Sequence, residues 1–526
     1  MALFNIGYML KRIEDARNNK ALWESLLRDC YDYAMPEKQT MDNKTKGTMK
    51  RNFLYDDTAV EALDRFAART QSQVVPAWRK WCMFKAGSEI PDENKEELEG
   101  YLSEATEVLF DHINHSNFTT QATEAFLEMG ISTGCLIIEE GDGIKSHLNF
   151  RSVPISELIV EATSQGRIGT AWRDITVPAR DIKQIWSKAK LSDNLEKILA
   201  KDDDTPIHII EGVAFDEKTR KYISMVLYPQ DKYVLFEEEL ETSAYVIFRE
   251  SVTSGETLGR GRVMKKLPTI KLLNKVVEFY LRAAAMSISG MYTAMDDGII
   301  NPDMIVLEPG VIIPVGSNDN SNPSLKRVDT AGDPQLANLI IKDLQYSIKN
   351  FMLSEPFGQI DETPVRSATE MSIRDNESRE MAGASFGRLQ SEFLEPVITR
   401  SVDILKKSGK IADIRIDGKE VTVKFTSPAA KKQDMAEVDT LVQYAQVMQF
   451  LPPEYVEEGI KLEDMPQSVA ELMGIPQKYM RTKVEKEKRA KAKQMQQQQM
   501  MQQQVAMQGA TAQVETEGKI QGGMNG

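Results

Sequence analysis

The stretch "SGETLGRGRVMKKLPTIKLLNK", residues 254–275, joins a strand-like segment to a long amphipathic helix. Glycines and basic residues at the start of a helix are typical of phosphate-binding loops, because backbone N–H groups there attract anions. The spacing excludes both common forms of that site. No part of the chain supplies the G-x-x-x-x-G-K-[ST] loop, and Met264 stands where the dinucleotide fingerprint begun by Gly259 and Gly261 needs a glycine or alanine.

The composition around this stretch is that of a folded, acidic protein. The chain has 526 residues, of which 41% are hydrophobic and 27% charged, and at ~150 residues per domain this length predicts three or four folded units. A net charge of −14 argues against a protein that grips DNA through a broad basic face. The N-terminus lacks the pattern of a signal peptide, and no apolar run of about 18 residues predicts a membrane span.

Cysteine and histidine usage gives no sign of a metal or redox centre. Cys30, Cys82 and Cys135 are far apart and lack CxxC spacing, so we expect free thiols in a reducing compartment and no zinc framework. His112 and His115 stand three residues apart, but no cysteine or acidic cluster of suitable spacing joins them. We therefore predict no metal, no cofactor and no catalytic residues.

Hydrophobic periodicity on both sides of the opening stretch predicts an α+β fold. The N-terminal side begins with four helical patterns, at 5–35, 55–73, 93–112 and 119–132. A β-hairpin is predicted in "TGCLIIEEGDGIKSHLNFRSVP", where a compact apolar run and an alternating run flank a Gly-Asp-Gly turn. Further short strands are predicted at 166–177, 207–213, 221–227, 233–237 and 243–250.

The C-terminal side is mostly helical. Helices are predicted at 262–290 and 333–352, with "MIVL" and "VIIPV" as short strands between them. Ser367 and Glu370 fit a capping box that opens a helix running toward Lys407, with Pro396 as a kink. Strands follow at 411–426, then helices, and the Gln/Met-rich tail is expected to be disordered beyond about Gln508.

In the order of its motifs the chain resembles the head-to-tail connector, or portal, proteins of short-tailed DNA bacteriophages. The motifs are "RNFLYDDTAVEALDRFAARTQSQVVPAWRKWCMF", "TGCLIIEE", "ETLGRGRVMKKLPTIKLLNK" and "RSATEMSIRDNE", and the resemblance covers about residues 1–450. It implies a non-enzymatic ring of about twelve subunits at one vertex of the viral head, with double-stranded DNA passing through its centre. It also implies the virion as location, with assembly in the host cytoplasm.

The resemblance further implies partners and a division of the chain. The partners are the terminase large subunit, the major capsid and scaffolding proteins and the tail adaptor proteins, with no membrane. The implied parts are a wing (1–258 and 367–426), a first stem helix (259–290), a clip (291–332), a second stem helix (333–352), a tunnel loop (353–366), a helical crown (427–492) and the tail (493–526).

Three groups of residues carry the functional expectations. In the tunnel loop they are Gln359, Asp361, Glu362, Thr363 and Arg366, although an ordinary surface connection fits the same composition. Lys271, Lys275 and Arg282 either face the channel and meet DNA phosphates or pair with acidic side chains of a neighbouring stem helix. At the wing–stem joint, Gly259 and Gly261 would supply backbone freedom, and Pro268 would occupy the first helical turn or kink the helix.

Two other classes of protein stay open. One is a head–tail adaptor without a channel. The other is a packaging nuclease or NTPase, which would need a phosphate loop or a carboxylate metal cluster. The run ending in Glu139 and Glu140 has the form of a Walker B strand, but without a Walker A partner a hairpin strand is the favoured interpretation.

Overall fold

The structure is a computed structural model that describes residues 5–38, 53–77, 79–87, 92–163, 168–289, 291–294, 325–328, 334–352, 386–412 and 421–428, with isolated residues besides. The chain divides into two compact units, Met1–Ala429 and Ala430–Gly526. Every element named below belongs to the first unit. The predicted crown helices and tail lie almost entirely outside the described residues.

Five helices dominate the N-terminal part: α1 (Ile6–Ala21), α2 (Glu24–Ala34), α3 (Thr58–Val74), α4 (Asp92–Asn114) and α5 (Phe118–Ile131). The predictions for α3, α4 and α5 are confirmed to within three residues at each end. The single helix predicted over 5–35 is wrong, because the chain breaks at Leu22 and Trp23. Helix α1 packs on a β-sheet whereas α2 packs on another helix, so tertiary contacts impose a break that no proline or glycine marks.

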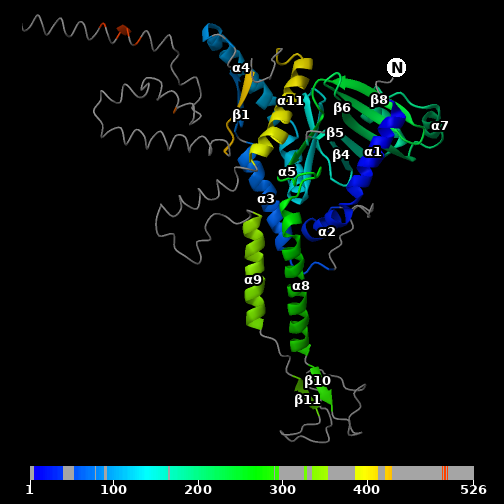
Figure 1. The fold of residues 1–526 in the computed structure, drawn as a ribbon, viewed down its shortest axis with the longest axis vertical. Coiled ribbons are helices and arrows are strands. Elements are labelled where there is room, and N and C mark those ends of the chain that lie inside the picture. The colour runs from blue at the N-terminus through cyan, green and yellow to red at the C-terminus, as the bar shows by residue number, and fades with distance from the viewer. Residues whose placement is uncertain are drawn as a thin grey trace, which may run out of the picture. The chain divides into compact units, whose positions relative to one another are not determined.

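A three-stranded antiparallel sheet with the order β3-β2-β9 lies among these helices. Its strands are β2 (Thr133–Glu140), β3 (Leu148–Ser152) and β9 (Tyr245–Arg249). The predicted hairpin is confirmed, with Ile138 opposite Phe150. Strand β2 is buried from Thr133 to Ile138, and α5 packs against it (Figure 1). This burial explains why the sequence shows a continuous apolar run there rather than an alternation.

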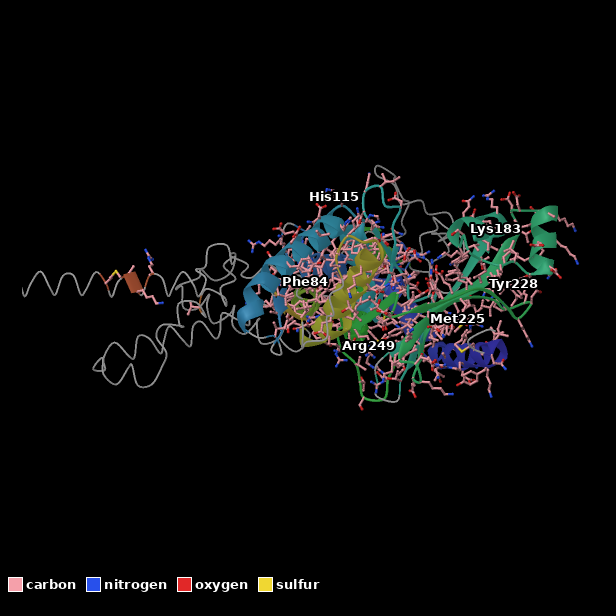
Figure 2. The ribbon with its side chains drawn as sticks, turned by 90° about the horizontal axis from the view of Figure 1, so that it is seen from above. Phe84, His115, Lys183, Met225, Tyr228 and Arg249 are labelled. Carbon is pink, nitrogen blue, oxygen red and sulfur yellow. The ribbon has the colours of Figure 1, made fainter. Side chains whose placement is uncertain are left out.

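A second, five-stranded antiparallel sheet has the order β4-β5-β6-β7-β8. It is built from β4 (Leu158–Ala162), β5 (Ile168–Pro178), β6 (Pro206–Asp216), β7 (Lys221–Tyr228) and β8 (Tyr233–Leu240). Met225 packs in the core on the α1 side, and Tyr228 packs in a separate core beneath α6 (Ile182–Ile185) and α7 (Asp193–Lys201) (Figures 1 and 2). The sequence analysis missed β4, α6 and α7.

Helix α1 is held to this sheet by its basic side chains. Arg12 Nη2 lies 2.5 Å from Glu161 Oε2, and Arg17 Nη2 lies 2.7 Å from Asp174 Oδ2. Lys20 is only 9% exposed, and its Nζ donates to the backbone oxygen of residue 156 at 2.7 Å. Burial lowers the pKa of the Lys20 ammonium to about 8, against an ordinary value of 10.5. The contact of Lys20 thus fixes α1 on the sheet, but burying its ammonium group costs free energy of desolvation.

We expect Lys20→Met to remove part of the pH dependence of stability. Because the folded pKa lies below the unfolded one, the unfolded chain binds more protons between about pH 8 and 10.5, so wild-type stability rises with pH across that window. The variant should lose this contribution, and its stability near pH 7 should change by less than about 1.5 kcal/mol. Urea unfolding at about pH 7 and about pH 10 measures the stability of each protein and its change with pH. An equal change of stability with pH in the wild type and the variant would contradict a lowered pKa for Lys20.

Two long helices, α8 (Arg262–Ser289) and α9 (Pro334–Phe351), confirm the prediction and lie side by side, extending together away from the sheets (Figure 1). We call them the helix pair. An antiparallel hairpin of β10 (Met291–Ala294) and β11 (Leu325–Val328) belongs to the segment between them. The predicted strands "MIVL" and "VIIPV" lie outside the described residues. Pro268 lies in the second turn of α8 rather than its first, because the helix already begins at Arg262.

The C-terminal segment of the first unit packs against its N-terminal part. A helix described from Phe386 passes through a π-helical turn, Gln390–Leu394, into α11 (Glu395–Lys407). The π-helical turn ends two residues before Pro396, where we predicted a kink, and a proline that donates no N–H bond suits such an irregularity. Strand β12 (Val421–Phe425) then pairs with β1 (Cys82–Ala86). The capping box at Ser367 lies outside the described residues.

These elements confirm the α+β class. Cys30, Cys82 and Cys135 are free thiols, and all three are buried. Burial raises the pKa of the Cys30 thiol to about 12, which keeps it protonated and unreactive. In the parts of the chain that the structure describes, no helix is both long and apolar enough to cross a membrane.

Candidate functional site

The opening stretch of sequence forms a tight joint between β2 and α8. The Gly259 N–H donates to Thr133 Oγ1 at 2.9 Å, and the Ser132 hydroxyl donates to the Gly259 oxygen at 2.7 Å. The Gly261 N–H donates to the Ile131 oxygen at 3.2 Å. A Cβ on Gly259 would lie 2.6 Å from the Ser132 oxygen, and one on Gly261 would overlap the backbone of Ile131.

Close approach, rather than backbone freedom, is therefore what the joint requires of its glycines. Neither Gly259 nor Gly261 has a φ in the left-handed region, so any residue could adopt their backbone conformation. The expected reason for these glycines was wrong. A side chain is excluded because two backbone segments run in contact there, more than 120 residues apart in the sequence.

Polar contacts join the start of α8 to the end of α9. Arg262 Nη1 donates to the Phe351 oxygen at 2.6 Å, and Lys266 Nζ donates to Ser347 Oγ at 2.9 Å. The Lys266 ammonium also lies 5.4 Å from the centroid of the Phe351 ring. Ile348 is fully buried one turn before the end of α9. These contacts fix the last turn of α9 against the first turns of α8.

A buried asparagine fastens a loop to the same region. Asn274, 6% exposed on α8, donates from Nδ2 to the Phe53 oxygen at 2.8 Å and accepts from the Tyr55 N–H at 2.7 Å. Gln345 on α9 donates to Asp56 Oδ2 at 2.8 Å. The loop before α3 thus bridges both helices. The sequence analysis missed this role; a polar residue on the apolar face of a predicted helix was its only signal.

The predicted basic residues all have acidic partners within the chain. Lys271 Nζ lies 2.6 Å from Asp29 Oδ2 on α2, and Lys275 Nζ lies 2.8 Å from Glu278 Oε2. Arg282 Nη2 lies 2.5 Å from Glu278 Oε1. The hydrogen bond from Lys275 and the Arg282 charge lower the pKa of Glu278. Lys271 is thus paired with its own carboxylate, whereas Lys275 and Arg282 share that of Glu278, so this cluster keeps one formal positive charge.

The outer sides of the helix pair are apolar and exposed. Leu272 and Phe279 on α8 are 54% and 56% exposed, and their spacing of seven places them on one face, which we call the α8 edge. Leu339 and Tyr346 on α9 are 61% and 57% exposed with the same spacing, and form the α9 edge. Of the fourteen large exposed apolar side chains among the described residues, eight lie on this pair: Leu272, Phe279, Leu281, Leu336, Leu339, Ile340, Tyr346 and Phe351. Such a concentration indicates a protein interface.

The five predicted tunnel-loop residues, Gln359, Asp361, Glu362, Thr363 and Arg366, lie outside the described residues. The structure describes the chain up to Met352, just after α9, and again from Phe386. It therefore gives the two ends between which this segment runs, and the assignment of the segment stays a prediction.

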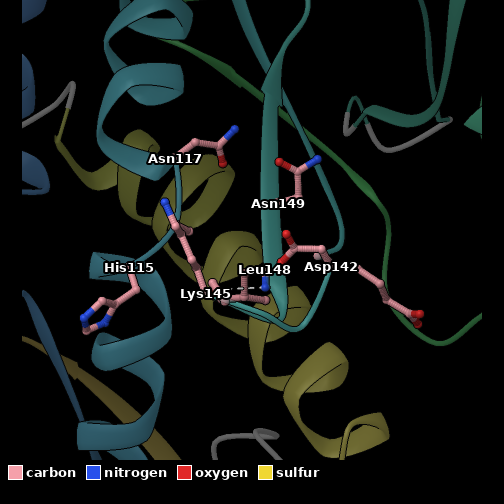
Figure 3. A pocket seen from close by; sticks show the side chains of 10 residues that line it. His115, Asn117, Asp142, Lys145, Leu148 and Asn149 are labelled. Atoms are coloured by element: carbon pink, nitrogen blue, oxygen red, sulfur yellow. Dashed lines mark hydrogen bonds between the residues drawn. The ribbon is translucent and has the colours of Figure 1, made fainter.

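A polar pocket of about 320 Å³ lies between the α4–α5 connection and the β2–β3 hairpin (Figure 3). Lys145 extends along it toward Asn117, whose amide is already bonded to the backbone of residue 150. Burial and the neighbouring His147, whose ring centroid is 5.3 Å away, lower the pKa of His112. Within the described ranges, no three His, Cys, Asp or Glu side chains are grouped to hold a metal. The contacts of Asn117 hold the β2–β3 hairpin against the connection between α4 and α5.

The run with the form of a Walker B strand is a hairpin strand, bonded on both edges. Glu139 accepts a hydrogen bond from Arg151 Nη2 at 2.6 Å on the neighbouring strand. The carboxylate therefore stabilises the pairing of β2 with β3.

Comparisons with known proteins identify relatives of this chain. The family model for the bacteriophage head to tail connecting protein matches residues 7–480, from α1 through every element described above. The chain is also similar to a probable portal protein of Bordetella phage BPP-1, with 21% identity over 451 residues that cover 81% of this chain and 79% of the relative. The resemblance in the sequence is thereby confirmed: the chain belongs to the family of bacteriophage head-to-tail connecting proteins.

Proposed function

We propose that this chain is a portal protein, whose copies form a closed ring at one vertex of a phage head. Double-stranded DNA would enter and leave the head through the centre of the ring. The single observation that carries this proposal is the exposure of two apolar edges on the helix pair, in a chain of the connector family. A phage connector needs self-assembly and an axial opening, and side-by-side packing of helix pairs provides both.

The two edges favour a ring over a dimer. The α8 edge carries Leu272 and Phe279, and the α9 edge carries Leu339 and Tyr346, so the two surfaces differ. Packing of one edge against the other is heterologous, which leaves a free edge on each new copy until the assembly closes. Each of these side chains is already nearly half buried in the single chain, so completing its burial contributes about 1 kcal/mol. Repeated around a ring, these contacts stabilise the assembly.

The parts of the chain then take the roles that the resemblance implied. The helix pair is the stem, 291–332 with the β10–β11 hairpin is the clip, and 1–258 with 367–426 is the wing. Segment 353–366 is the tunnel loop, and 427–492 is the crown inside the head. The clip would meet the terminase large subunit and later the tail adaptors, and the wing would meet capsid and scaffolding proteins.

The charge of the chain suits a channel that DNA slides through. Duplex DNA carries one negative charge per about 1.7 Å of axis, and every phosphate that a protein neutralises adds affinity and hence drag. The net charge of −14 keeps such neutralisation low, and Glu278 offsets one of the two positive charges of Lys275 and Arg282. The passage of DNA would thus meet little attraction.

A packaging assay tests the proposal. Heads assembled from shell and scaffolding proteins with and without this chain are supplied with the packaging motor, ATP and DNA, and the nuclease-protected DNA is measured. We expect protected DNA only in heads that contain the chain. Heads that fill equally well without it would show that the chain acts after packaging, as an adaptor does, and the proposal would be wrong.

Deletion of 357–363 is expected to separate assembly from DNA handling. If this segment is the tunnel loop, the variant should form rings as the wild type does, because both apolar edges are retained, while protected DNA in the packaging assay should fall at least about tenfold. Loss of ring formation would instead show that the segment is a structural connection. The matched control replaces the same seven residues with a Gly/Ser segment of equal length.

A further inference from the structure

Strand β9 ends in two adjacent buried charges, Arg249 and Glu250, which are 3% and 8% exposed. In the view of Figure 2, the label of Arg249 stands between those of Phe84 on strand β1 and Met225 on strand β7. Buried charges persist only where they are paired and hydrogen-bonded. Each of these two residues has a partner on a different element, so this point connects three parts of the fold.

Arg249 holds the π-helical turn. Its Nη2 lies 2.7 Å from Glu392 Oε1, its Nε lies 3.2 Å from Glu392 Oε2, and its backbone N–H donates to the same Oε2 at 3.0 Å. Its Nη1 donates to the Thr257 oxygen at 2.9 Å. Both oxygens of Glu392 are thus bonded in bidentate geometry, which is the strongest form of such a pair.

Glu250 holds the helix pair. Its Oε1 accepts from Arg262 Nε at 2.6 Å, while Arg262 Nη1 donates to the Phe351 oxygen in the last turn of α9. The Arg262 guanidinium also lies over the rings of Phe66 and Phe351. A helix leaves its last carbonyls without internal partners, and a cation at that end satisfies them. Arg262 therefore links Glu250, which follows β9, to the last turn of α9.

The Glu250–Arg262 and Arg249–Glu392 ion pairs differ in how many carboxylate oxygens are hydrogen-bonded. Glu250 Oε2 is buried and has no hydrogen-bond partner among the described residues, whereas both oxygens of Glu392 are used. In the described part of the chain, Glu250 is thus bonded to Arg262 through a single oxygen. Such an arrangement is less stable than the bidentate pair beside it.

We propose that Arg249 and Glu250 form a two-part latch, in which the Glu250–Arg262 pair can release the last turn of α9 while the Arg249–Glu392 pair stays closed. Arg262 is the positioning residue, and it acts through the Phe351 carbonyl. Release would let the end of the second stem helix move against the sheet without separating the helix pair. The importance of the latch for DNA passage rests on the proposed channel function. The existence of the latch does not depend on that function.

Hydrogen–deuterium exchange of the full chain tests the latch through residues 345–352. We expect Glu250→Gln to speed exchange in this segment about tenfold, because the cap on α9 loosens, while the overall melting temperature changes little. Glu256→Gln is the control for loss of a carboxylate charge, since it removes the charge of the more exposed Glu256–Arg260 ion pair on the adjacent loop. Unchanged exchange in Glu250→Gln, or equal acceleration in Glu256→Gln, would overturn the latch.

Arg262→Lys provides an independent variant. An ammonium is a single point donor without the planar fork that reaches Glu250 and Phe351 together, so we expect the same local opening with the charge retained. The double variant Glu250→Gln/Arg262→Lys should open no further than either single variant, because both break one unit. Additive effects, or loss of the folded chain in both single variants, would show an ordinary core ion pair and overturn the proposal.

Packaged heads test the coupling to function. Heads that contain the Glu250→Gln chain should hold at least about threefold less nuclease-protected DNA than wild-type heads, with the Glu256→Gln control at the wild-type level. Faster exchange with normal DNA protection would overturn the coupling of the latch to the channel. Failure of wild-type heads to protect DNA would instead refute the channel function, so the two failures are distinguishable.

Discussion

Gly261→Val is expected to prevent the joint between β2 and α8 from forming. A Cβ at Gly261 would overlap the backbone carbonyl group of Ile131, and backbone atoms in a paired segment cannot move aside as a flexible side chain can. Valine adds two methyl groups to that overlap. We expect a loss of at least about 3 kcal/mol of stability, which places the variant among the strongly destabilised substitutions.

Thermal unfolding and the yield of soluble protein measure this effect. The matched control is Gly100→Val on α4, where an added Cβ meets nothing within 4 Å. That control should stay within about 0.5 kcal/mol of the wild type, because glycine and valine both have low helix propensity and the site has room. If Gly261→Val had the melting temperature of the wild type, the backbone segments at Gly261 and Ile131 would not be in contact.

The second large effect is expected from charges placed on the apolar edges. Phe279→Glu and Leu339→Glu should each abolish assembly, leaving monomers. Each variant loses about 1 kcal/mol of apolar burial at every interface and must also desolvate a carboxylate there. Because a closed ring repeats the same contact between all its copies, every interface is weakened at once.

Sedimentation of purified protein measures the assembly state. Asn338→Glu is the matched control, since it introduces the same charge one residue before Leu339 on a different face of α9. We expect this control to assemble, and all three variants to unfold cooperatively on heating, as folded chains do. Normal assembly of both edge variants would show that the exposed apolar side chains do not form the interface between copies.

Local patterns in the sequence predicted the elements that local physics determines. The β2–β3 hairpin and α5 were predicted because an apolar run, a turn and a helical period lie within one short segment. Helix α7 was missed, although Ser192 caps it by accepting from the Leu195 N–H at 3.2 Å, and that capping residue was a usable signal. Strand β4 is only five residues long and is defined by its pairing with β5.

Contacts between distant parts of the chain could not be predicted in this way. The position of the joint was predicted, but its glycines serve a contact with residues 131–133 that no spacing reveals. Arg249 and Glu392 are 143 residues apart, and Lys271 and Asp29 are 242 residues apart. Charge patterning along one helix therefore showed where the basic residues lie but not which residues neutralise them.

The central claim is that copies of this chain close into a ring with an open centre. Electron-microscope images of the purified protein, averaged for rotational symmetry, test it most directly. We predict closed rings with a central hole and the helix pairs packed side by side around the axis. Particles without a central hole, or a population of compact monomers at concentrations where the chain is folded, would contradict the claim.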